Sequence, residues 1–330
     1  MMNTLKGKEM NSSQRFYDLV PFSPLGAFGL VVLAILPLFP PFNQEYFLQW
    51  LIVAAILGGQ AIAFDFTGGF INIINFGFAA FVGLGAYTSA LMAIHFGLSP
   101  WITMFTGALS AGLLGLLTGI ITLRLRGIFA VFMTWWLGLA LMGLTTKMVW
   151  LTRGPLGLRC PPLFETSSNL PYFYTILVMV VVTYIVLRWI TRTHMGLAFK
   201  AIGQNMEAAR TSGINPKRYR IINFTISCAF AGWIGGFYAH FIGILTPHLM
   251  DTSKTVEVLA IALIGGRGSL WGGAFVAFPF LIGMEMIKSS LSQLPGLHLV
   301  IYGLLLALIM IYYPDGVAKL HDRLFSRSSS

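Results

Sequence analysis

Long apolar stretches, separated by short polar connections, dominate the chain. They lie at about residues 25–41, 46–66, 79–95, 101–122, 127–151, 172–190, 221–245, 255–290 and 297–313. A transmembrane helix needs roughly 20 apolar residues, so the pattern predicts about eight to ten membrane-spanning helices. No connection is long and polar enough to form a separate soluble domain. We therefore expect an all-α polytopic membrane protein with a single transmembrane domain over residues 25–318.

The composition supports a membrane protein. Of the 330 residues, 56% are hydrophobic and 10% are charged, whereas soluble domains carry about 25% charged residues. The formal net charge of +10 is typical of chains that bind nucleic acid, but the basic residues lie in the connections between apolar stretches. Such a placement follows the positive-inside bias of membrane proteins. We therefore expect contacts with membrane lipid and no nucleic-acid partner.

The basic residues also predict an orientation. Basic clusters follow the fourth and last apolar stretches, and a longer basic segment runs from Arg188 to Arg220 after the sixth. Placing all three clusters in the cytoplasm also places both terminal tails there, at residues 1–24 and 319–330. The loop 152–171 then lies outside, although it carries two arginines.

Two glycine-rich segments interrupt the apolar pattern, Thr67–Gly77 and Ala262–Gly273. Non-helical backbone at membrane depth is tolerated only where it is buried in protein or lines a water-filled cavity. A pair of such segments, one in each half of a chain, indicates a translocation pathway. The candidate pathway residues are Gly68, Gly69, Asn72, Asn75, Gly77, Phe78, Gly265, Gly266 and Gly268. The stretch 255–290 fits either two spans or one re-entrant hairpin followed by a short helix.

Polar residues within the apolar stretches are candidates for function because they are costly in a membrane. Asn72 and Asn75 are three residues apart and would share one face of a helix. Their amides could contact a polar solute or hydrogen-bond neighbouring helices. Asp65 lies near the predicted cytoplasmic end of a span. A stripe of small residues spaced four apart predicts close helix packing and comprises Gly107, Ala111, Gly115 and Gly119.

Motifs for enzymatic chemistry are missing from the sequence. The six histidines show no metal-ligand spacing, and two cysteines cannot build a disulfide framework. The segment Gly265–Gly273 lacks the Lys-Ser/Thr ending of a phosphate-binding loop. We therefore expect no catalytic residue, no bound metal or cofactor, and no ATP hydrolysis by this chain.

The basic segment contains a second candidate site, in a loop over about residues 191–220. Leu197–Thr211 has a helical composition, and Gly213 lies where a glycine commonly ends a helix. Ala208 and Ala209 are small, as a helix seated in the groove of another protein requires, and Glu207 could pair with a basic group there. The residues alone fit a docking helix and a loop that contacts anionic lipid equally well.

The same segment resembles a known family. Glu207-Ala208-Ala209 followed by Gly213 is similar to the EAA loop of ABC-importer permeases, and the continuation to Tyr219 is similar to the branched-chain amino-acid permeases. Further similarity lies in 81–88, 263–272 and 313–316. The resemblance covers roughly residues 45–318 and is closest to the LivM-type subunit.

The resemblance implies a permease subunit in a bacterial inner membrane. Its expected partners are a LivH-type second permease, two cytoplasmic ATP-binding subunits that hydrolyse ATP, and an extracytoplasmic solute-binding protein. The residues that would couple the permease to an ATPase are Glu207, Ala208, Ala209 and Gly213.

Branched-chain amino acids are the substrate that the resemblance favours. The segment before Gly85 departs from the family's common Gly-x-x-Ser-x-Gly-His pattern, because Asn75 replaces the serine and Phe78 the histidine. Urea, short amides and aromatic acids therefore remain alternatives within the family. A secondary transporter that acts alone is the main alternative outside it.

Overall fold

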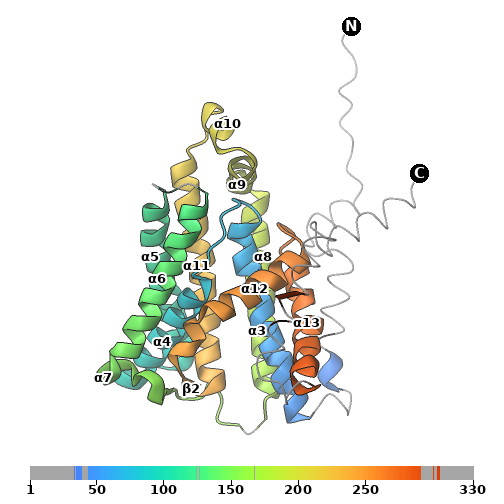
Figure 1. Ribbon diagram of the computed structural model, residues 1–330. Coiled ribbons are helices and arrows are strands. Elements are labelled where there is room, and N and C mark those ends of the chain that lie inside the picture. The colour runs from blue at the N-terminus through green and yellow to red at the C-terminus, as the bar shows by residue number, and fades with distance from the viewer. Residues whose placement is uncertain are drawn as a thin grey trace, which may run out of the picture.

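The computed structural model describes residues 44–290 apart from 124, 126 and 167, together with residues 33, 35–38, 300, 303 and 304. The long helices lie side by side as a bundle, with α9 and α10 at one end and β2 and α7 at the other (Figure 1). The terminal tails 1–24 and 319–330, and most of the predicted spans 25–41 and 297–313, lie outside the described residues.

Among the described residues, six helices are long and apolar enough to cross a membrane. They are α3 (Glu45–Gly68), α4 (Phe78–Phe96), α5 (Pro100–Thr122), α6 (Ile128–Lys147), α8 (Leu170–Arg192) and α11 (Pro216–Ile242). The other elements are η1 (Leu36–Leu38), α7 (Val149–Thr152), η3 (Gly154–Leu156), β1 (Leu158–Arg159), α9 (His194–Gln204), α10 (Met206–Thr211), β2 (Ile244–Leu245), η4 (Pro247–Met250), α12 (Thr252–Gly265) and α13 (Trp271–Ser290). The predicted all-α polytopic class is confirmed.

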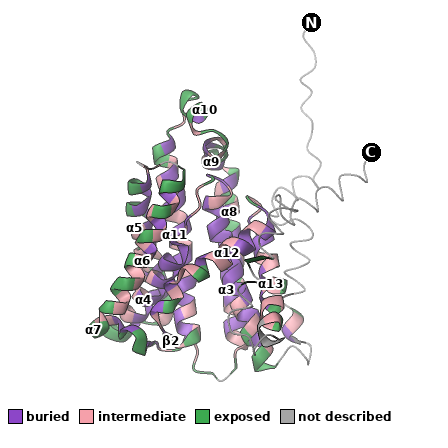
Figure 2. Ribbon diagram, viewed as in Figure 1, coloured by how far each residue is buried: buried purple, intermediate pink, exposed green. Residues whose placement is uncertain are grey.

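The spans differ in how deeply they are buried. In their most apolar windows, α3 is 78% buried and α6 only 17%. Figure 2 shows exposed residues along α5 and α6 at one edge of the bundle. The exposed residues of α6 include Phe129, Phe132 and Trp136. An apolar helix with an exposed apolar face suits contact with lipid tails, so α3 belongs to the core of the bundle and α6 to its rim.

The small-residue stripe on α5 packs against α11, and the predicted close packing is confirmed. Ala111 is fully buried. A side-chain carbon added at Gly115 would lie 2.6 Å from Cβ of Cys228, and one at Gly119 would lie 3.3 Å from Cα of Ile221. Both distances are shorter than the roughly 3.5 Å at which two carbon atoms are in ordinary van der Waals contact. Larger side chains at Gly115 and Gly119 would therefore push α5 and α11 apart.

The end of the bundle opposite α10 is held together by a short sheet and a buried histidine. Strands β1 and β2 pair antiparallel, with Leu158 opposite Leu245. His240 Nδ1 donates to the carbonyl oxygen of Pro161 (2.8 Å), and its Nε2 lies 2.9 Å from the hydroxyl oxygen of Ser89. Since a carbonyl can only accept, the proton of the neutral ring lies on Nδ1. These bonds join the loop after α7 to α4 and α11.

The thiol of Cys160, in this loop, should react slowly. Burial raises its pKa to about 12, so at neutral pH the thiol stays protonated, whereas maleimides react with the thiolate. We expect Cys160 to label at least about tenfold more slowly at neutral pH than a cysteine introduced at the exposed position Thr166. Labelling of Cys160 should rise as the pH approaches its pKa. Equal rates at neutral pH would contradict the burial of this thiol.

Candidate functional site

The first glycine-rich segment breaks the helical run between α3 and α4. Residues 69–77 are not helical, and Asn72 has a backbone φ of 60°. Asn72 is exposed, whereas Asn75 is buried. The prediction that the two asparagines share a helix face is therefore wrong, because the segment has no helical periodicity on which that spacing rule could act.

The second glycine-rich segment separates α12 from α13. With 14 residues, α12 is about 21 Å long, shorter than the roughly 30 Å hydrocarbon core of a bilayer. The break covers residues 266–270, after which α13 packs against α3. The stretch 255–290 therefore forms two helices joined at a break, and α12 alone is too short to cross the hydrocarbon core.

A buried carboxylate joins the end of α3 to the second break. Asp65, in the last turns of α3, is 4% exposed. Its Oδ1 accepts the backbone N–H of Gly268 (2.8 Å), and its Oδ2 accepts that of Leu270 (2.9 Å). Gly69 approaches Gly268 so closely that an added side-chain carbon would overlap the backbone nitrogen of Gly268. The structure thus brings Gly69 and Gly268, which are far apart in the sequence, to one point.

Side chains of α11 hydrogen-bond to carbonyl groups in the last two turns of α3. The hydroxyl of Ser227 donates to the carbonyl oxygen of Ala63 (2.6 Å), and the Asn223 amide donates to that of Phe66 (2.9 Å). Helix ends leave unpaired backbone groups, and a membrane interior offers no water to pair with them. The Phe66 carbonyl is one of the last four of α3, and Asn223 supplies its partner.

The start of α4 is satisfied in the same way by side chains of other segments. The N–H of Phe76 donates to Thr134 Oγ1 of α6 (3.1 Å), and that of Ala79 donates to Thr255 Oγ1 of α12 (3.0 Å). Asn75 Oδ1 accepts the N–H of Gly77 (3.2 Å), while its Nδ2 lies 3.9 Å from Cys228 Sγ. The Asn75 amide therefore makes contacts within the fold. This agrees with the interpretation that it bonds to neighbouring segments of the protein.

Most of the other predicted pathway residues serve close packing. Phe78 is fully buried and meets Phe64 edge-on, with ring centroids 5.3 Å apart. Gly77 lies against the backbone of Thr134, and Gly265 lies against that of Gly272 and Gly273. Gly266 is buried, whereas Gly68 and Gly268 are partly exposed.

Asn72 is the predicted pathway residue that lines a groove. The groove has a volume of about 340 Å³, within the range of roughly 300–1,000 Å³ typical of ligand pockets. It lies between the first break, the α5–α6 turn and the end of α9, and we call it the Asn72 groove. Its lining comprises Ile71, Asn72, Ile73, Ile74, Leu125, Gly127, Ala130, Val131, Ile202, Gly203, Gln204, Met206 and Arg220. Amide, guanidinium and branched alkyl groups thus line the same space.

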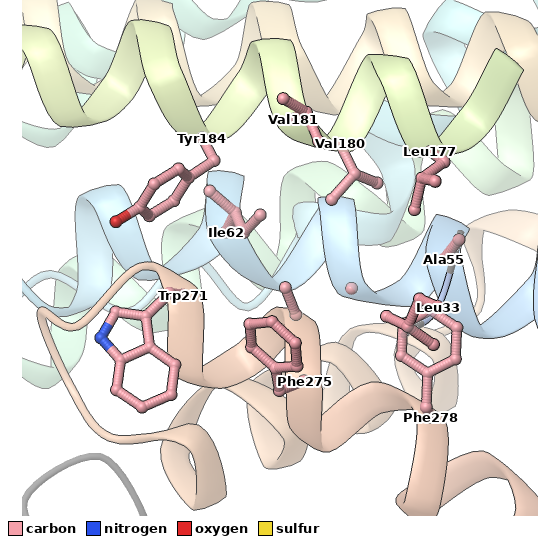
Figure 3. Close-up of a pocket in the computed structure, with 12 residues that line it drawn as sticks. Leu33, Ala55, Ile62, Leu177, Val180, Val181, Tyr184, Trp271, Phe275 and Phe278 are labelled. Atoms are coloured by element: carbon pink, nitrogen blue, oxygen red, sulfur yellow. The ribbon is translucent and has the colours of Figure 1, made fainter. Parts of the chain in front are cut away.

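A second cavity, between α3, α8 and α13, is apolar and small. Figure 3 shows Phe275 and Phe278 of α13 with Ile62 of α3 and Val180 of α8 around it. Its volume of about 30 Å³ is close to that of one water molecule. Such a space suits helix packing and not the passage of a polar solute.

The middle of the basic segment folds into α9 and the short helix α10, which projects at the end of the bundle (Figure 1). Asn205 caps α10, because its Oδ1 accepts the N–H groups of Glu207 (3.0 Å) and Ala208 (3.1 Å). Glu207 and Ala208 are exposed, but Ala209 is buried. Ala209 therefore packs against the protein's own fold and does not belong to the exposed surface of α10.

Gly213 ends α10 where the sequence predicts. Its φ is +82°, its N–H donates to the carbonyl oxygen of Arg210 (3.1 Å), and the N–H of Ile214 donates to that of Ala209 (3.0 Å). This pair of bonds is a Schellman motif, in which the residue with positive φ is usually glycine. The conformation of the turn therefore depends on Gly213.

Arg220 connects α10 to the spans beside it. Its side chain is 9% exposed. Nη2 donates to the carbonyl oxygen of Thr122 at the end of α5 (3.3 Å), and Nη1 lies 3.8 Å from Met206 Sδ at the start of α10. One guanidinium thus ties α10 to α5 and α11.

Sequence reasoning missed several residues that build this region. Asp65 was noticed only for its place near a span end, and the polar residues of α6, α11 and α12 were not singled out. Asn223 and Ser227 are four apart and so share one face of α11, a signal that a search for polar residues within apolar stretches would detect. Among the described residues, no group of three His, Cys, Asp or Glu side chains could hold a metal ion.

Six long apolar helices among the described residues, packed as a bundle, define a multi-pass membrane protein. Residues 46–310 match the family described as branched-chain amino acid transport system / permease component, and the chain belongs to this family.

Curated relatives carry several kinds of substrate in their names. The chain is 27% identical over 277 residues to the high-affinity branched-chain amino acid transport system permease protein LivM of Escherichia coli (strain K12), a match that covers 76% of this chain and 64% of that protein. It is 25% identical over 289 residues to the fructose import permease protein FrcC of Rhizobium meliloti (80% of this chain, 76% of that protein). It is also 25% identical over 269 residues to the guanosine ABC transporter permease protein NupQ of Bacillus subtilis (strain 168), a match that covers 73% of this chain and 82% of that protein.

The chain thus spans less than two thirds of the length of the LivM protein. No solved structure matches the chain.

Removing the Asp65 carboxylate should destabilise the bundle. In Asp65→Ala the buried N–H of Leu270 and the partly buried N–H of Gly268 lose their acceptor, and a buried group left without a partner costs about 1–3 kcal/mol. We expect a clear fall in the thermal unfolding temperature of the purified protein in detergent. The unfolding temperature of Asp65→Asn should lie between those of Asp65→Ala and the unaltered protein, since the amide oxygen can still accept one of the two bonds.

Glu257→Ala is the matched control for this change. Glu257 pairs with Lys254 (3.0 Å) in a partly exposed ion pair, and such pairs contribute about 0–1 kcal/mol. An unfolding temperature of Asp65→Ala as high as that of the control would contradict the role of the carboxylate.

Proposed function

We propose that this chain is a permease subunit of an ABC importer that moves a small polar solute across the inner membrane. The observation that carries the proposal is the exposed, doubly capped helix α10 at one end of the bundle, in a chain of this family. ATP is hydrolysed by partner subunits, and α10 seats in a groove on one of them.

The complete transporter contains four kinds of subunit in this proposal. A LivH-type permease pairs with this chain, two ATP-binding subunits lie in the cytoplasm, and a solute-binding protein delivers the solute from outside. The α10 end is cytoplasmic, as are the tails 1–24 and 319–330, and the β1–β2 end faces the binding protein. Residues 25–318 form the transmembrane domain. The positive-inside bias supports this orientation, because α10 lies within the basic segment.

A branched-chain amino acid is the proposed substrate. The Asn72 groove offers an amide for the polar end of such a molecule and branched alkyl side chains for the other end. The name of the LivM relative agrees with this choice. The names of the fructose and guanosine permeases make a sugar or a nucleoside the alternatives to test beside urea, short amides and aromatic acids.

The coupling role of α10 follows from how an ATPase can act on a permease. A partner shifts the equilibrium between two permease states only through contacts that differ between those states. The caps at Asn205 and Gly213 fix the shape of α10, and Arg220 ties it to two spans. A displacement of α10 is therefore passed to the bundle.

The alternative, a secondary transporter that acts alone, would use an ionisable group inside the membrane to bind the driving ion. Asp65 is the buried carboxylate of the described spans. Both of its oxygens already accept backbone N–H groups, so it suits a structural role better than ion coupling. Uptake into vesicles that needs ATP and the partner subunits, and that no ion gradient alone supports, would exclude this alternative.

Gly213→Pro should abolish ATP-dependent uptake while the protein still reaches the membrane. Proline fixes φ near −65° and removes the N–H, so the turn after α10 cannot form. The matched control is Gly243→Pro, because Gly243 also has positive φ (75°) and donates to a helix carbonyl, that of Ala239 (3.2 Å). It lies at the other end of the bundle. Equal loss of uptake in both variants would mean general damage and would contradict a specific role of Gly213.

Glu207→Lys should weaken binding to the ATP-binding subunits and reduce uptake. The change reverses the charge of an exposed residue on α10, and a reversed charge at an interface mainly alters affinity and partner choice. Co-purification of the subunits and solute uptake are the measurements. Glu165→Lys, at an exposed site in the loop before α8, lies at the other end of the bundle and is the control for co-purification, which it should leave unchanged. Undiminished co-purification and uptake in Glu207→Lys would rule out the docking role of this residue.

A further inference from the structure

Helix α9 packs directly on the first break. Gly203, in its last turn, lies against the backbone of Phe70, so that an added side-chain carbon would overlap the Phe70 carbonyl oxygen. It would also lie 3.4 Å from the carbonyl carbon of Ile71. A contact between backbones transmits displacement well, because no flexible side chain stands between the two segments.

Two side chains of α9 strengthen the same contact. Phe199 is fully buried and meets Phe66 of α3 edge-on, with ring centroids 5.6 Å apart. The Lys200 ammonium lies 5.8 Å from the centroid of the Phe70 ring, within the range of a cation–π contact. Helix α9 is thus held to both sides of the point where α3 ends.

Helix α9 is also joined tightly to α10. Only Asn205 separates the two helices. Its N–H donates to the carbonyl oxygen of Ala201 in α9 (3.0 Å), while its side chain caps α10. One residue therefore bonds to both helices, which makes it difficult for α10 to move without α9.

The Asn72 groove lies at this contact. One side is formed by Ile202 and Gln204 at the end of α9 together with the first break, and the other includes Leu125 and Gly127 of the α5–α6 turn. A joint shift of α9 and the break relative to this turn therefore changes the width of the groove.

We propose that Gly203 is a positioning residue that passes the movement of α10 to the first break and so controls the width of the Asn72 groove. This inference rests on the proposed function. The absence of a side chain at position 203 lets the two backbones touch, so that displacement of α10 by the ATP-binding subunit reaches Asn72 without loss. A side chain at this position holds α9 away from the break and uncouples ATP hydrolysis from transport.

The test uses the whole transporter, reconstituted in vesicles with its partner subunits, and measures solute taken up per ATP hydrolysed. We expect Gly203→Ala to keep its ATPase activity while the ratio falls about tenfold, the scale of coupling changes caused by residues between two sites. The matched control is Gly143→Ala on α6, where an added carbon meets nothing within 4 Å. If Gly203→Ala has the same ratio as the control, the inference is overturned. This holds also when solute uptake and ATP hydrolysis fall together and leave the ratio unchanged.

A second variant decides the matter if Gly203→Ala fails to accumulate. Lys200 is exposed, so Lys200→Gln removes its contact with Phe70 while the fold is kept. We expect the ratio to fall about threefold, in line with an exposed cation–π contact. An unchanged ratio in this variant overturns the inference. Failure of the proposed function looks different, because the unaltered transporter would then take up solute without any need for ATP.

Discussion

The two hydrogen bonds of the Asp65 carboxylate are the constraint on which the rest of the bundle depends. Backbone groups inside a membrane must find hydrogen-bond partners within the protein. Both breaks leave N–H and carbonyl groups that have no partner within a helix. Asp65 pairs with Gly268 and Leu270 of the second break, while α11 pairs with the end of α3. Each break is therefore held by segments distant in the sequence.

At the α10 end of the bundle, backbone groups find their partners locally and not in distant segments. There Asn205 and Gly213 close the helix ends with local bonds, and the exposed face of α10 stays available to a partner. Between the two regions lies α9, which contacts α10 through Asn205 and the first break through Gly203. The locally capped helix α10 is thus connected to a break whose geometry depends on the whole bundle.

This difference explains which features could be predicted from the sequence. Apolar stretches predicted the six long helices because burial in lipid is a property of each segment, and Gly213 marked a helix end because positive φ is a local requirement. The burial of Ala209 and the bonds of Asp65 and Asn75 could not be predicted, because they depend on residues from other helices. The expectation that Asn72 and Asn75 share a helix face failed because it assumes a regular helix, and the chain is not helical in this glycine-rich segment.

The sequence separation of the Asp65 bonds has a consequence for biosynthesis. Its partners lie 203 and 205 residues further along the chain, so they leave the ribosome long after α3 has entered the membrane. At a synthesis rate of about 5–20 residues per second, the carboxylate waits roughly 10–40 seconds for them. During that time another group, such as water or the insertion machinery, has to solvate it. Assembly of the two breaks is therefore a late event, completed only after the second half of the chain has been inserted.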